Sequence, residues 1–408
     1  AEPDIERKIK NAFQIPQVVV FTGHMLDRPG RLEPRFPACL EGQVKQNIRE
    51  RLINMDGRIG FASGACGADI IFLETVLELG GQMHLVLPFN LDQFLKERVA
   101  IIPDSDWPSR LNRLMEKATD VIWASSQPMR DSIISFQYTN LLLLGLAKIK
   151  AKQFLTDVIP MAVWDGRPGD GLYGTAHTVE DWRGRGLSVE IIALDQLLGS
   201  DQSSKTINKL PASQIESPPV PTPEKYEETI KAILFADVVG FSKLGDLDIP
   251  LFVEYFLGGI AEVIAKNKYH PLLKATWGDG IYLIFDTVRE AGSFALDLRD
   301  FTLEQDWTGY GIPKSLNLRI SLHSGPVYHC RDPLMEKMVF SGGHVTRAAR
   351  IEPITPPGHV YASSEFAAMA AADEVEEFSC EYVGLIQLAK KYGTVPLFHV
   401  RRSEIKVF

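Results

Sequence analysis

Two aspartates of this chain stand where apolar segments end, and paired carboxylates are a means of binding metal ions. Asp237 directly follows the apolar segment 232–236, and Asp279 lies in a Gly-Asp-Gly turn between two further apolar segments. The interval between them has room for a helix and a returning strand, so adjacent strands would bring both carboxylates to one rim of a sheet. Mg²⁺ binds through one or two carboxylates plus substrate phosphates, and a pair of such ions assists an attacking and a leaving oxygen. Aspartate also favours turns for structural reasons, so neither residue alone is diagnostic.

Other polar residues of the C-terminal half offer weaker arrangements for chemistry. His323 and Ser324 are adjacent, which suggests a hydrolase, but this pair lacks the orienting acid of a nucleophilic triad. His329 and Cys330 have no companion at metal-ligand spacing. We therefore expect His323 to be a structural histidine at a strand end.

Paired strands interleaved with helices are expected to position Asp237 and Asp279. Apolar segments bounded by turns predict strands, and apolar residues at helical spacing predict helices. The pattern indicates an α+β domain over residues 226–402, with helices on one side of its sheet. The predicted strands are 232–236, two within 272–286, 316–321 and 359–362, and the predicted helices are 251–266, 288–300 and 342–351.

Five segments of this domain, taken in order, resemble the class III adenylate/guanylate cyclase catalytic domain, which implies a ferredoxin-like core. KAILFADVVGFSKL (231–244) and KATWGDGIYLIF (274–285) are similar to the two metal-binding segments of that family. LRISLHSGPV (318–327) is similar to a family strand. The segment 341–366 is similar to the one that carries the transition-state residues, and 384–400 is similar to the closing hairpin.

The resemblance implies which residues bind metal ions and phosphates. It implies two Mg²⁺ or Mn²⁺ ions per active site, held by Asp237, Asp279 and the backbone carbonyl of Val238. It also implies that Gly240 and Phe241 belong to a loop whose backbone N–H groups surround the substrate phosphates.

The resemblance further implies that Arg350 binds the triphosphate, where a fixed guanidinium meets the charge that builds on phosphoryl oxygens. The family has Asn four residues before this arginine as a second transition-state residue. Here that position is Thr346, whose hydroxyl has a shorter reach than an amide. The base-contacting positions of the family correspond to Ala275 and Val339, while Lys274 stands one residue earlier and so on the other side of a strand. These positions therefore do not specify which nucleotide base the substrate carries.

The function expected from this resemblance is that of a nucleotide cyclase, which converts a nucleoside triphosphate into a 3′,5′-cyclic monophosphate and pyrophosphate. ATP is the family default, and GTP or a pyrimidine triphosphate is the alternative. Family active sites combine the metal aspartates of one subunit with the Thr346 and Arg350 segment of another, which implies an antiparallel homodimer with two shared sites. A degenerate cyclase fold that binds nucleotide as a sensor is the second hypothesis.

A separate domain is expected over residues 12–198, where apolar strands alternate with helical segments. This alternation predicts an α/β domain whose parallel sheet is covered on both faces. The predicted strands are 17–23, 59–63, 83–87, 120–124, 159–164 and 189–193, and the predicted helices are 43–52, 68–79 and 135–151.

Glycine turns follow the first two of these strands. One contains Thr22 and Gly23, and the other contains Ser63, Gly64 and Gly67 before a predicted helix. Free N–H groups at the N-terminus of a helix bind anions, although glycine also serves tight turns for purely structural reasons.

The segments SGACGAD (63–69) and LVLPF (85–89) resemble the SLOG superfamily of Rossmann-like domains. This resemblance implies a regulatory domain that binds a nucleotide-like ligand through the five turn residues. The segments 164–167 and 174–177 are candidates for closing over that ligand. The alternative, an enzyme acting on nucleotides, lacks a recognisable nucleophile and base.

Composition agrees with two globular domains joined by a linker at 199–225, which is rich in Ser and Pro. The net charge of −9 argues against a nucleic acid or an anionic membrane as partner. Four cysteines without a CxxC pair argue against a zinc or disulfide framework and favour a cytoplasmic location. We find no secretory signal, and the most apolar segment, 141–146, is too short to span a bilayer.

Overall fold

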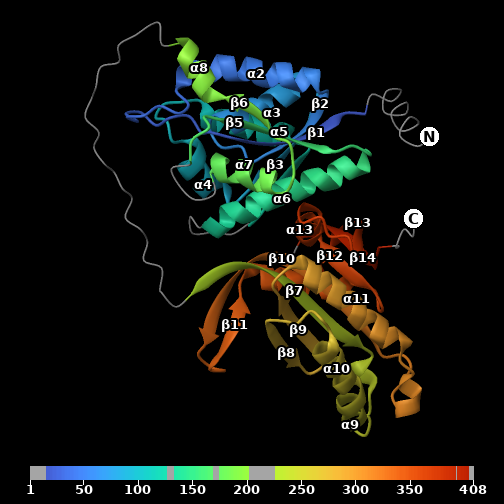
Figure 1. Ribbon diagram of the computed structural model, residues 1–408. Coiled ribbons are helices and arrows are strands. Elements are labelled where there is room, and N and C mark those ends of the chain that lie inside the picture. The colour runs from blue at the N-terminus through green and yellow to red at the C-terminus, as the bar shows by residue number, and fades with distance from the viewer. Residues whose placement is uncertain (1–14, 126–132, 169–173, 202–225, 392, 404–408) are drawn as a thin grey trace, which may run out of the picture. The chain divides into compact units, whose positions relative to one another are not determined.

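The computed structural model describes residues 15–125, 133–168, 174–201, 226–391 and 393–403 (Figure 1). The chain divides into two compact units between positions 219 and 220, within the segment predicted as a linker. Most of that linker, 202–225, lies outside the described residues. Its first residues belong to helix α8 (Leu194–Asp201), so the helix extends past the predicted boundary at 199.

The N-terminal unit contains a six-stranded sheet whose strands are all parallel, as predicted. The strand order is β4-β3-β2-β1-β5-β6, so the direction of winding reverses between β1 and β5. The apolar residues of β1 are completely buried, which is typical of a parallel strand covered on both faces. The strands are β1 (Gln17–Gly23), β2 (Gly57–Ala62), β3 (Gln82–Leu87), β4 (Asp120–Trp123), β5 (Val158–Trp164) and β6 (Glu190–Ala193).

Helices cover both faces of this sheet, and Figure 1 shows α2 on one side and α6 and α7 on the other. The ring of Phe21 on β1 stacks on Phe72 of α3, with centroids 4.3 Å apart. Helices α5 and α7 were not predicted; Pro108 in the first turn of α5 looks like a helix breaker but is compatible with that position. The elements are η1 (Ala38–Leu40), α2 (Glu41–Asn54), α3 (Ala68–Glu78), α4 (Leu91–Phe94), η2 (Leu95–Val99), α5 (Trp107–Lys117), α6 (Ile133–Gln153) and α7 (Thr175–Gly184).

The C-terminal unit contains an eight-stranded mixed sheet with β7 near its centre. The order is β13-β14-β12-β10-β7-β9-β8, and β11 pairs with the far end of β10. Strands β7 and β10 are much longer than predicted because polar residues continue both strands beyond their apolar segments. The strands are β7 (Glu227–Val239), β8 (Leu273–Trp277), β9 (Gly280–Phe285), β10 (Asn317–Asp332), β11 (Lys337–Ser341), β12 (Val360–Ser363), β13 (Phe378–Gln387) and β14 (Thr394–Arg402).

Helices lie on both faces of this sheet, so the expectation of helices on one side is wrong. Ile233 of β7 and Tyr282 of β9 pack with Ala348 of α12, whereas Phe285 of β9 packs on Phe294 of α11. Successive strand residues point to opposite faces, so these contacts place α12 and α11 on different faces. The helical elements are η3 (Phe241–Lys243), α9 (Ile249–Leu251), η4 (Phe252–Leu257), α10 (Gly258–Lys266), α11 (Val288–Glu304), η5 (Trp307–Tyr310), α12 (Gly343–Ile351), η6 (Glu352–Ile354), α13 (Ser364–Ala372) and η7 (Ala389–Lys391).

A buried polar network fixes α12 to the sheet. His323 of β10 bonds through Nε2 to Nδ1 of His344 on α12 (2.9 Å) and through Nδ1 to Oγ of Ser363 (2.7 Å). Nη1 of Arg347, also on α12, lies 2.7 Å from Oε1 of Glu365. Burial lowers the pKa of His344 to about 4. Burial opposes ionisation of Glu365, but the Arg347 guanidinium together with smaller neighbouring contributions lowers the pKa of Glu365 to about 2. The imidazole of His344 is therefore neutral and the carboxylate of Glu365 is charged at neutral pH.

Two glycines of the SGACGAD segment have structural roles. Gly64 (φ +85°) and Gly67 (φ +103°) adopt the left-handed region that favours glycine. A Cβ on Gly67 would lie 2.7 Å from the backbone nitrogen of Leu26, because Met25 and Gly67 form a β-bridge. The loop after β1 thus packs directly on the backbone of the turn that precedes α3.

We expect Gly67→Ala to destabilise the N-terminal unit by about 3 kcal/mol or more, since backbone strain and a backbone clash combine. The matched control is Gly30→Ala, because Gly30 has φ +83° but nothing lies within 4 Å of its Cβ position. That variant should cost only the strain, about 1 kcal/mol. Urea unfolding followed by circular dichroism measures both, and equal effects would contradict the close packing of Gly67.

We expect Glu365→Gln to destabilise the C-terminal unit by about 3 kcal/mol, because the Arg347 guanidinium would lose its buried counter-charge. Glu262→Gln is the control, since Glu262 forms an exposed ion pair with Lys266 one turn away (2.7 Å) and its loss should leave stability unchanged. Measuring the free energy of unfolding of each variant tests this prediction. A Glu365→Gln protein as stable as the wild type would show that the network does not hold α12.

Candidate functional site

The register of β7 and β9 brings Asp237 and Asp279 together at one rim of the sheet. Asp237 is a strand residue paired with Gly280, and Asp279 lies in the turn immediately before that glycine. Partial burial raises the pKa of the Asp279 carboxyl, and the neighbouring negative charge of Asp237 raises it further. The two carboxylates therefore repel each other.

Two charged residues that the sequence analysis did not single out complete this rim. Arg319 lies opposite Asp237 in the register of β7 and β10, and its guanidinium forms an ion pair with that carboxylate. Nε of Arg319 also lies 3.0 Å from Oε1 of Glu352, at the start of η6. Burial, followed by the charge of Asp237 and then of Asp279, raises the pKa of Glu352 to about 7. Arg319 and Glu352 both fall inside segments that resemble the cyclase family, and this position was the sign in the sequence by which they could have been found.

The donor set of this rim fits a hard cation. Three carboxyl groups crowd around one guanidinium, so a cation would relieve repulsion among them. Across the described ranges, no group of three or more His, Cys, Asp or Glu residues is arranged to hold a metal ion by itself. Mg²⁺ does not need such a group, because it commonly binds through one or two carboxylates together with substrate phosphates and water.

A short loop with a left-handed glycine follows β7 directly after the segment that contains Asp237. Gly240 adopts φ +94°, and the short helix η3 begins at Phe241. The Phe241 ring packs against Phe252 with centroids 4.9 Å apart, which anchors the loop. The carbonyl of Val238 belongs to the same strand end, while its side chain is buried.

The two residues proposed for the transition state lie on the outward face of α12. The buried positions of this helix are His344, Ala348 and Ile351, so Thr346 and Arg350, one turn apart, share the other side. Thr346 is exposed, and Nε of Arg350 has no hydrogen-bond partner among the described residues. No hydrogen bond or ion pair within the described chain joins Arg350 to Asp237 or Asp279.

The positions proposed to contact the base lie on different faces. Ala275 packs with the cluster that includes Phe235 and Tyr282, on the face that carries α12. The rings of Phe235, Tyr282 and Trp277 stack beside it, with Phe235 and Tyr282 centroids 4.7 Å apart. Lys274 is exposed and points to the opposite face, because successive residues of a strand alternate. Val339 lies on β11, half-buried and paired with Cys330.

The histidine of SLHSG is structural, as expected, but it lies within β10 and not at a strand end, because β10 continues to Asp332. His323 is completely buried and bonds to His344 and Ser363. The neighbouring Ser324 points to the other face and donates to the carbonyl of Lys231 (3.1 Å). His323 and Ser324 therefore do not form a hydrolase pair.

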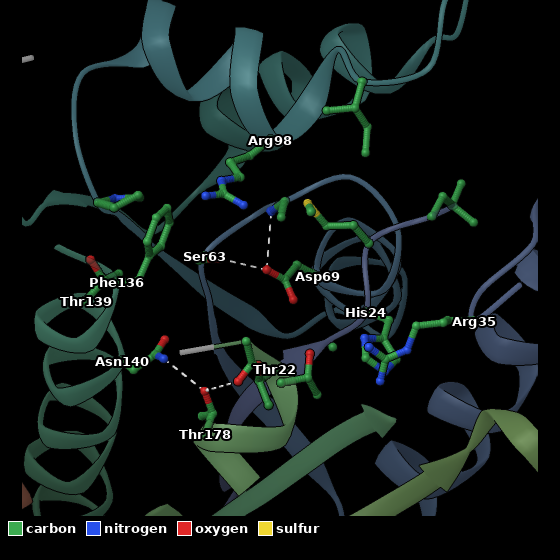
Figure 2. Close-up of a pocket in the computed structure, with 18 of the residues that line it drawn as sticks. Thr22, His24, Arg35, Ser63, Asp69, Arg98, Phe136, Thr139, Asn140 and Thr178 are labelled. Carbon is green, nitrogen blue, oxygen red and sulfur yellow. Dashed lines mark hydrogen bonds between the residues drawn. The ribbon is translucent and has the colours of Figure 1, made fainter. Parts of the chain in front are cut away.

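A cavity of about 670 Å³ opens in the N-terminal unit at the carboxyl ends of the strands (Figure 2). Ligands of open parallel sheets bind at this edge, where the strand order reverses, here between β1 and β5. Thr22, Gly23 and Ser63 line the cavity as proposed, whereas Gly64 and Gly67 are not among its lining residues. Further lining residues, which the sequence analysis did not name, include His24, Arg28, Arg98, Phe136, Asn140 and Thr178.

Asp165, within the segment 164–167, fixes the border of this cavity. Arg35 donates to both oxygens of Asp165, through Nε and Nη2 at 2.7 Å each, and Nε2 of His24 lies 3.0 Å from the same carboxylate. Although burial opposes it, the Arg35 guanidinium holds the pKa of Asp165 well below its usual range. Burial lowers the pKa of His24, so its imidazole is neutral at pH 7. Gly174 and Thr175 of the segment 174–177 also line the cavity.

Comparison with known proteins identifies the C-terminal domain. Residues 223–400 match the model of the adenylate and guanylate cyclase catalytic domain. None of the curated proteins matches the chain. Among the described helices, none is both long and apolar enough to cross a bilayer.

Several solved cyclase structures are similar to part of the chain. The adenylyl cyclase CyaB from P. aeruginosa is 19% identical, with 45% of this chain and all of that chain covered and a TM-score of 0.39. The guanylyl cyclase Cya2 is 20% identical, with 45% and 97% covered and a TM-score of 0.39. The guanylate cyclase domain of RhGC from Catenaria anguillulae, in complex with GTP, is 21% identical, with 44% and 100% covered and a TM-score of 0.37.

The family match confirms the resemblance inferred from the five segments, while the SLOG resemblance of the N-terminal domain stays a prediction. Residues 223–400 therefore form a class III nucleotide cyclase domain, a member of the adenylate and guanylate cyclase catalytic domain family.

Proposed function

We propose that the chain converts a nucleoside triphosphate into a 3′,5′-cyclic monophosphate and pyrophosphate at a two-metal site built on Asp237 and Asp279. The observation that carries this proposal is the juxtaposition of the two carboxylates at the end of β7 and in the β8–β9 turn. The match to the cyclase domain family supports it. Mg²⁺ or Mn²⁺ is the proposed cofactor.

Asp237, Asp279 and the carbonyl of Val238 would hold the metal ions. When bound, such ions lower the pKa of the ribose 3′-hydroxyl and neutralise charge on the triphosphate. The backbone N–H groups near Gly240 and Phe241 orient the phosphates. The Arg350 guanidinium then donates to the phosphoryl oxygens, where charge accumulates as the 3′-oxygen attacks the α-phosphorus in line and pyrophosphate leaves. Thr346 supplies one shorter donor from the same helix face.

The active site is proposed to form between two copies of the chain. Arg350 has no bond to the carboxylate rim within the described chain, and it shares the outward face of α12 with Thr346. A second protomer in antiparallel orientation would bring this face to the carboxylate rim, and symmetry would create two equivalent sites. Regulation by the N-terminal domain is proposed because that domain holds a separate cavity.

The base is proposed to lie near Ala275, with ATP as the default. Neither Ala275 nor Val339 carries a polar side chain that selects a base by hydrogen bonding. The stacked rings of Phe235, Tyr282 and Trp277 lie on the face of Ala275, and aromatic faces accept purines and pyrimidines alike. GTP and the pyrimidine triphosphates are therefore alternatives that an assay must separate.

A catalytically degenerate nucleotide sensor is the second candidate. Thr346 in place of the family's Asn favours it, because a shorter donor stabilises the transition state less well. Retention of both aspartates and of Arg350 favours the enzyme, since a sensor has less need of a complete metal site.

We expect the purified chain with Mn²⁺ to form one cyclic monophosphate plus pyrophosphate when ATP, GTP, CTP and UTP are tested separately by chromatography. Asp237→Asn and Asp279→Asn should each reduce kcat by at least about 1,000-fold, because each removes a charge that binds the metal ions. The matched control is Asp286→Asn. Asp286 lies just after β9 and pairs with Lys231 (2.6 Å) away from the site, so activity should stay within about twofold.

Full activity in a folded Asp279→Asn protein would refute the metal assignment. Binding of nucleotide and Mn²⁺ without product from any of the four triphosphates would favour the degenerate sensor, unless ligands of the N-terminal domain restore turnover.

We expect a heterodimer of Asp237→Asn and Arg350→Ala chains, isolated through two different affinity tags, to regain about half of the wild-type rate. Each variant alone is inactive, but the heterodimer contains one site with both residues intact. The control heterodimer combines Asp237→Asn with Asp279→Asn, in which each shared site carries one defective aspartate, so it should stay inactive. An inactive Asp237→Asn/Arg350→Ala heterodimer would contradict shared active sites.

A further inference from the structure

Arg319 occupies one of the carboxylates that the proposed metal site needs. Asp237 and Arg319 lie directly opposite each other in the register of β7 and β10, and Nη2 of Arg319 donates to Oδ2 of Asp237. The exposed fractions of the two side chains are 25% and 27%, so water screens the pair only in part. Hydrogen bonds between a guanidinium and a carboxylate are among the stronger ones in proteins. A cation that binds Asp237 therefore has to compete with this guanidinium.

The guanidinium of Arg319 has further acceptors within the carboxylate rim. Its Nη1 donates to the carbonyl of Pro353 (3.3 Å), and its Nε lies 3.0 Å from Oε1 of Glu352. The contact with Glu352 is an ion pair without the direction of a hydrogen bond, and Oε1 has no hydrogen-bond partner among the described residues. Glu352 can thus accept a hydrogen bond from Arg319 if Asp237 turns to another partner. Arg319 need not leave the rim when it releases Asp237.

A structural role alone does not explain where this ion pair lies. Oppositely charged residues on neighbouring strands stabilise a sheet, and Lys231 of β7 forms an ion pair of that kind away from the site. Arg319, in contrast, lies among the carboxyl groups of Asp237, Asp279 and Glu352. A positive charge at this place weakens the attraction of the rim for a cation.

We propose that Arg319 competes with divalent cations for Asp237 and so keeps the affinity of this site for a free cation low. The proposal rests on the metal site of the proposed function. Asp237 exchanges the guanidinium for the cation, and Arg319 moves its hydrogen bond to Glu352. A free cation offers only its own charge for this exchange, whereas a cation that arrives on a triphosphate brings phosphate ligands as well. Arg319 is therefore a positioning residue that favours the substrate-bound cation over the free one.

Binding of Mn²⁺ to the full chain at neutral pH, followed by the electron paramagnetic resonance of the free ion, tests this proposal. Arg319→Gln should bind Mn²⁺ at least fivefold more tightly than the wild type, because a positive charge beside Asp237 is lost. Arg319→Lys keeps that charge and should stay within twofold of the wild type. The equimolar complex of Mn²⁺ and inorganic triphosphate, titrated by calorimetry, should bind Arg319→Gln no more tightly than the wild type, because a guanidinium attracts phosphate while it repels the free cation.

Lys231→Gln is the matched control. It removes a positive charge from the same strand, six residues and about 20 Å before Asp237, so Mn²⁺ binding should be unchanged. Asp237→Asn defines the site, since Mn²⁺ binding that this variant abolishes is binding at the rim. Thermal melting followed by circular dichroism checks that each variant is folded, and Arg319→Met replaces Arg319→Gln if the glutamine variant does not fold.

The proposal is overturned if Arg319→Gln binds free Mn²⁺ no more tightly than the wild type, or if Arg319→Lys or Lys231→Gln gains as much affinity. An equal gain for the triphosphate complex overturns it too. If Asp237→Asn binds Mn²⁺ like the wild type, the metal site of the proposed function fails, and this proposal with it. Loss of binding in Asp237→Asn without a gain in Arg319→Gln refutes only the role of Arg319.

Discussion

The antiparallel register of β7 is the constraint on which the cyclase site depends. One strand must place Asp237 beside the Gly280 turn on one side and opposite Arg319 on the other. A slip of one residue would turn Asp237 to the face that carries α11 and would separate it from both neighbours. The apolar alternation of β7, with Leu234, Ala236 and Val238 buried, therefore specifies the chemistry as well as the core.

The carboxylate rim is a region of electrostatic conflict that the fold maintains. Asp237, Asp279 and Glu352 share a single guanidinium, that of Arg319, and the pKa values of Asp279 and Glu352 are raised as a result of burial and mutual repulsion. Proteins retain such arrangements where function requires them, because the same groups cost stability in the absence of a cation. The contacts that hold α12 to the sheet are different, because His344 bonds to His323 and the Arg347 guanidinium is paired with the buried carboxylate of Glu365.

Sequence patterns predicted those helices and strands that are defined by residues close together in the chain. The strands of the N-terminal sheet were found because parallel strands are uninterrupted apolar segments, and β1 has the predicted bounds. The cyclase motifs singled out Asp237, Asp279 and Arg350 as candidates because the order and spacing of the five segments are specific, and their roles stay predictions. The length of β10 was not predictable, since its second half contains the polar residues His329, Arg331 and Asp332, which are typical of a loop. Arg319 and Glu352 escaped notice because their role appears only when β7, β10 and η6 are brought together.

Asp69 shows where motif reading fails for a physical reason. Glycines before a helix suggest free N–H groups for an anion, and that inference assumes that the first turn carries no anion of its own. In this chain the SGACGAD segment provides both the turn and, at its last position, the carboxylate that occupies it. The glycines then serve close backbone packing, as Gly67 does against Leu26, while Asp69 accepts from the Ala65 N–H that an anion would otherwise meet. The two domains thus use carboxylates differently: in the cyclase domain Asp237 at the end of β7 and Asp279 in the β8–β9 turn lie together, whereas in the N-terminal domain Asp69 occupies the first turn of α3.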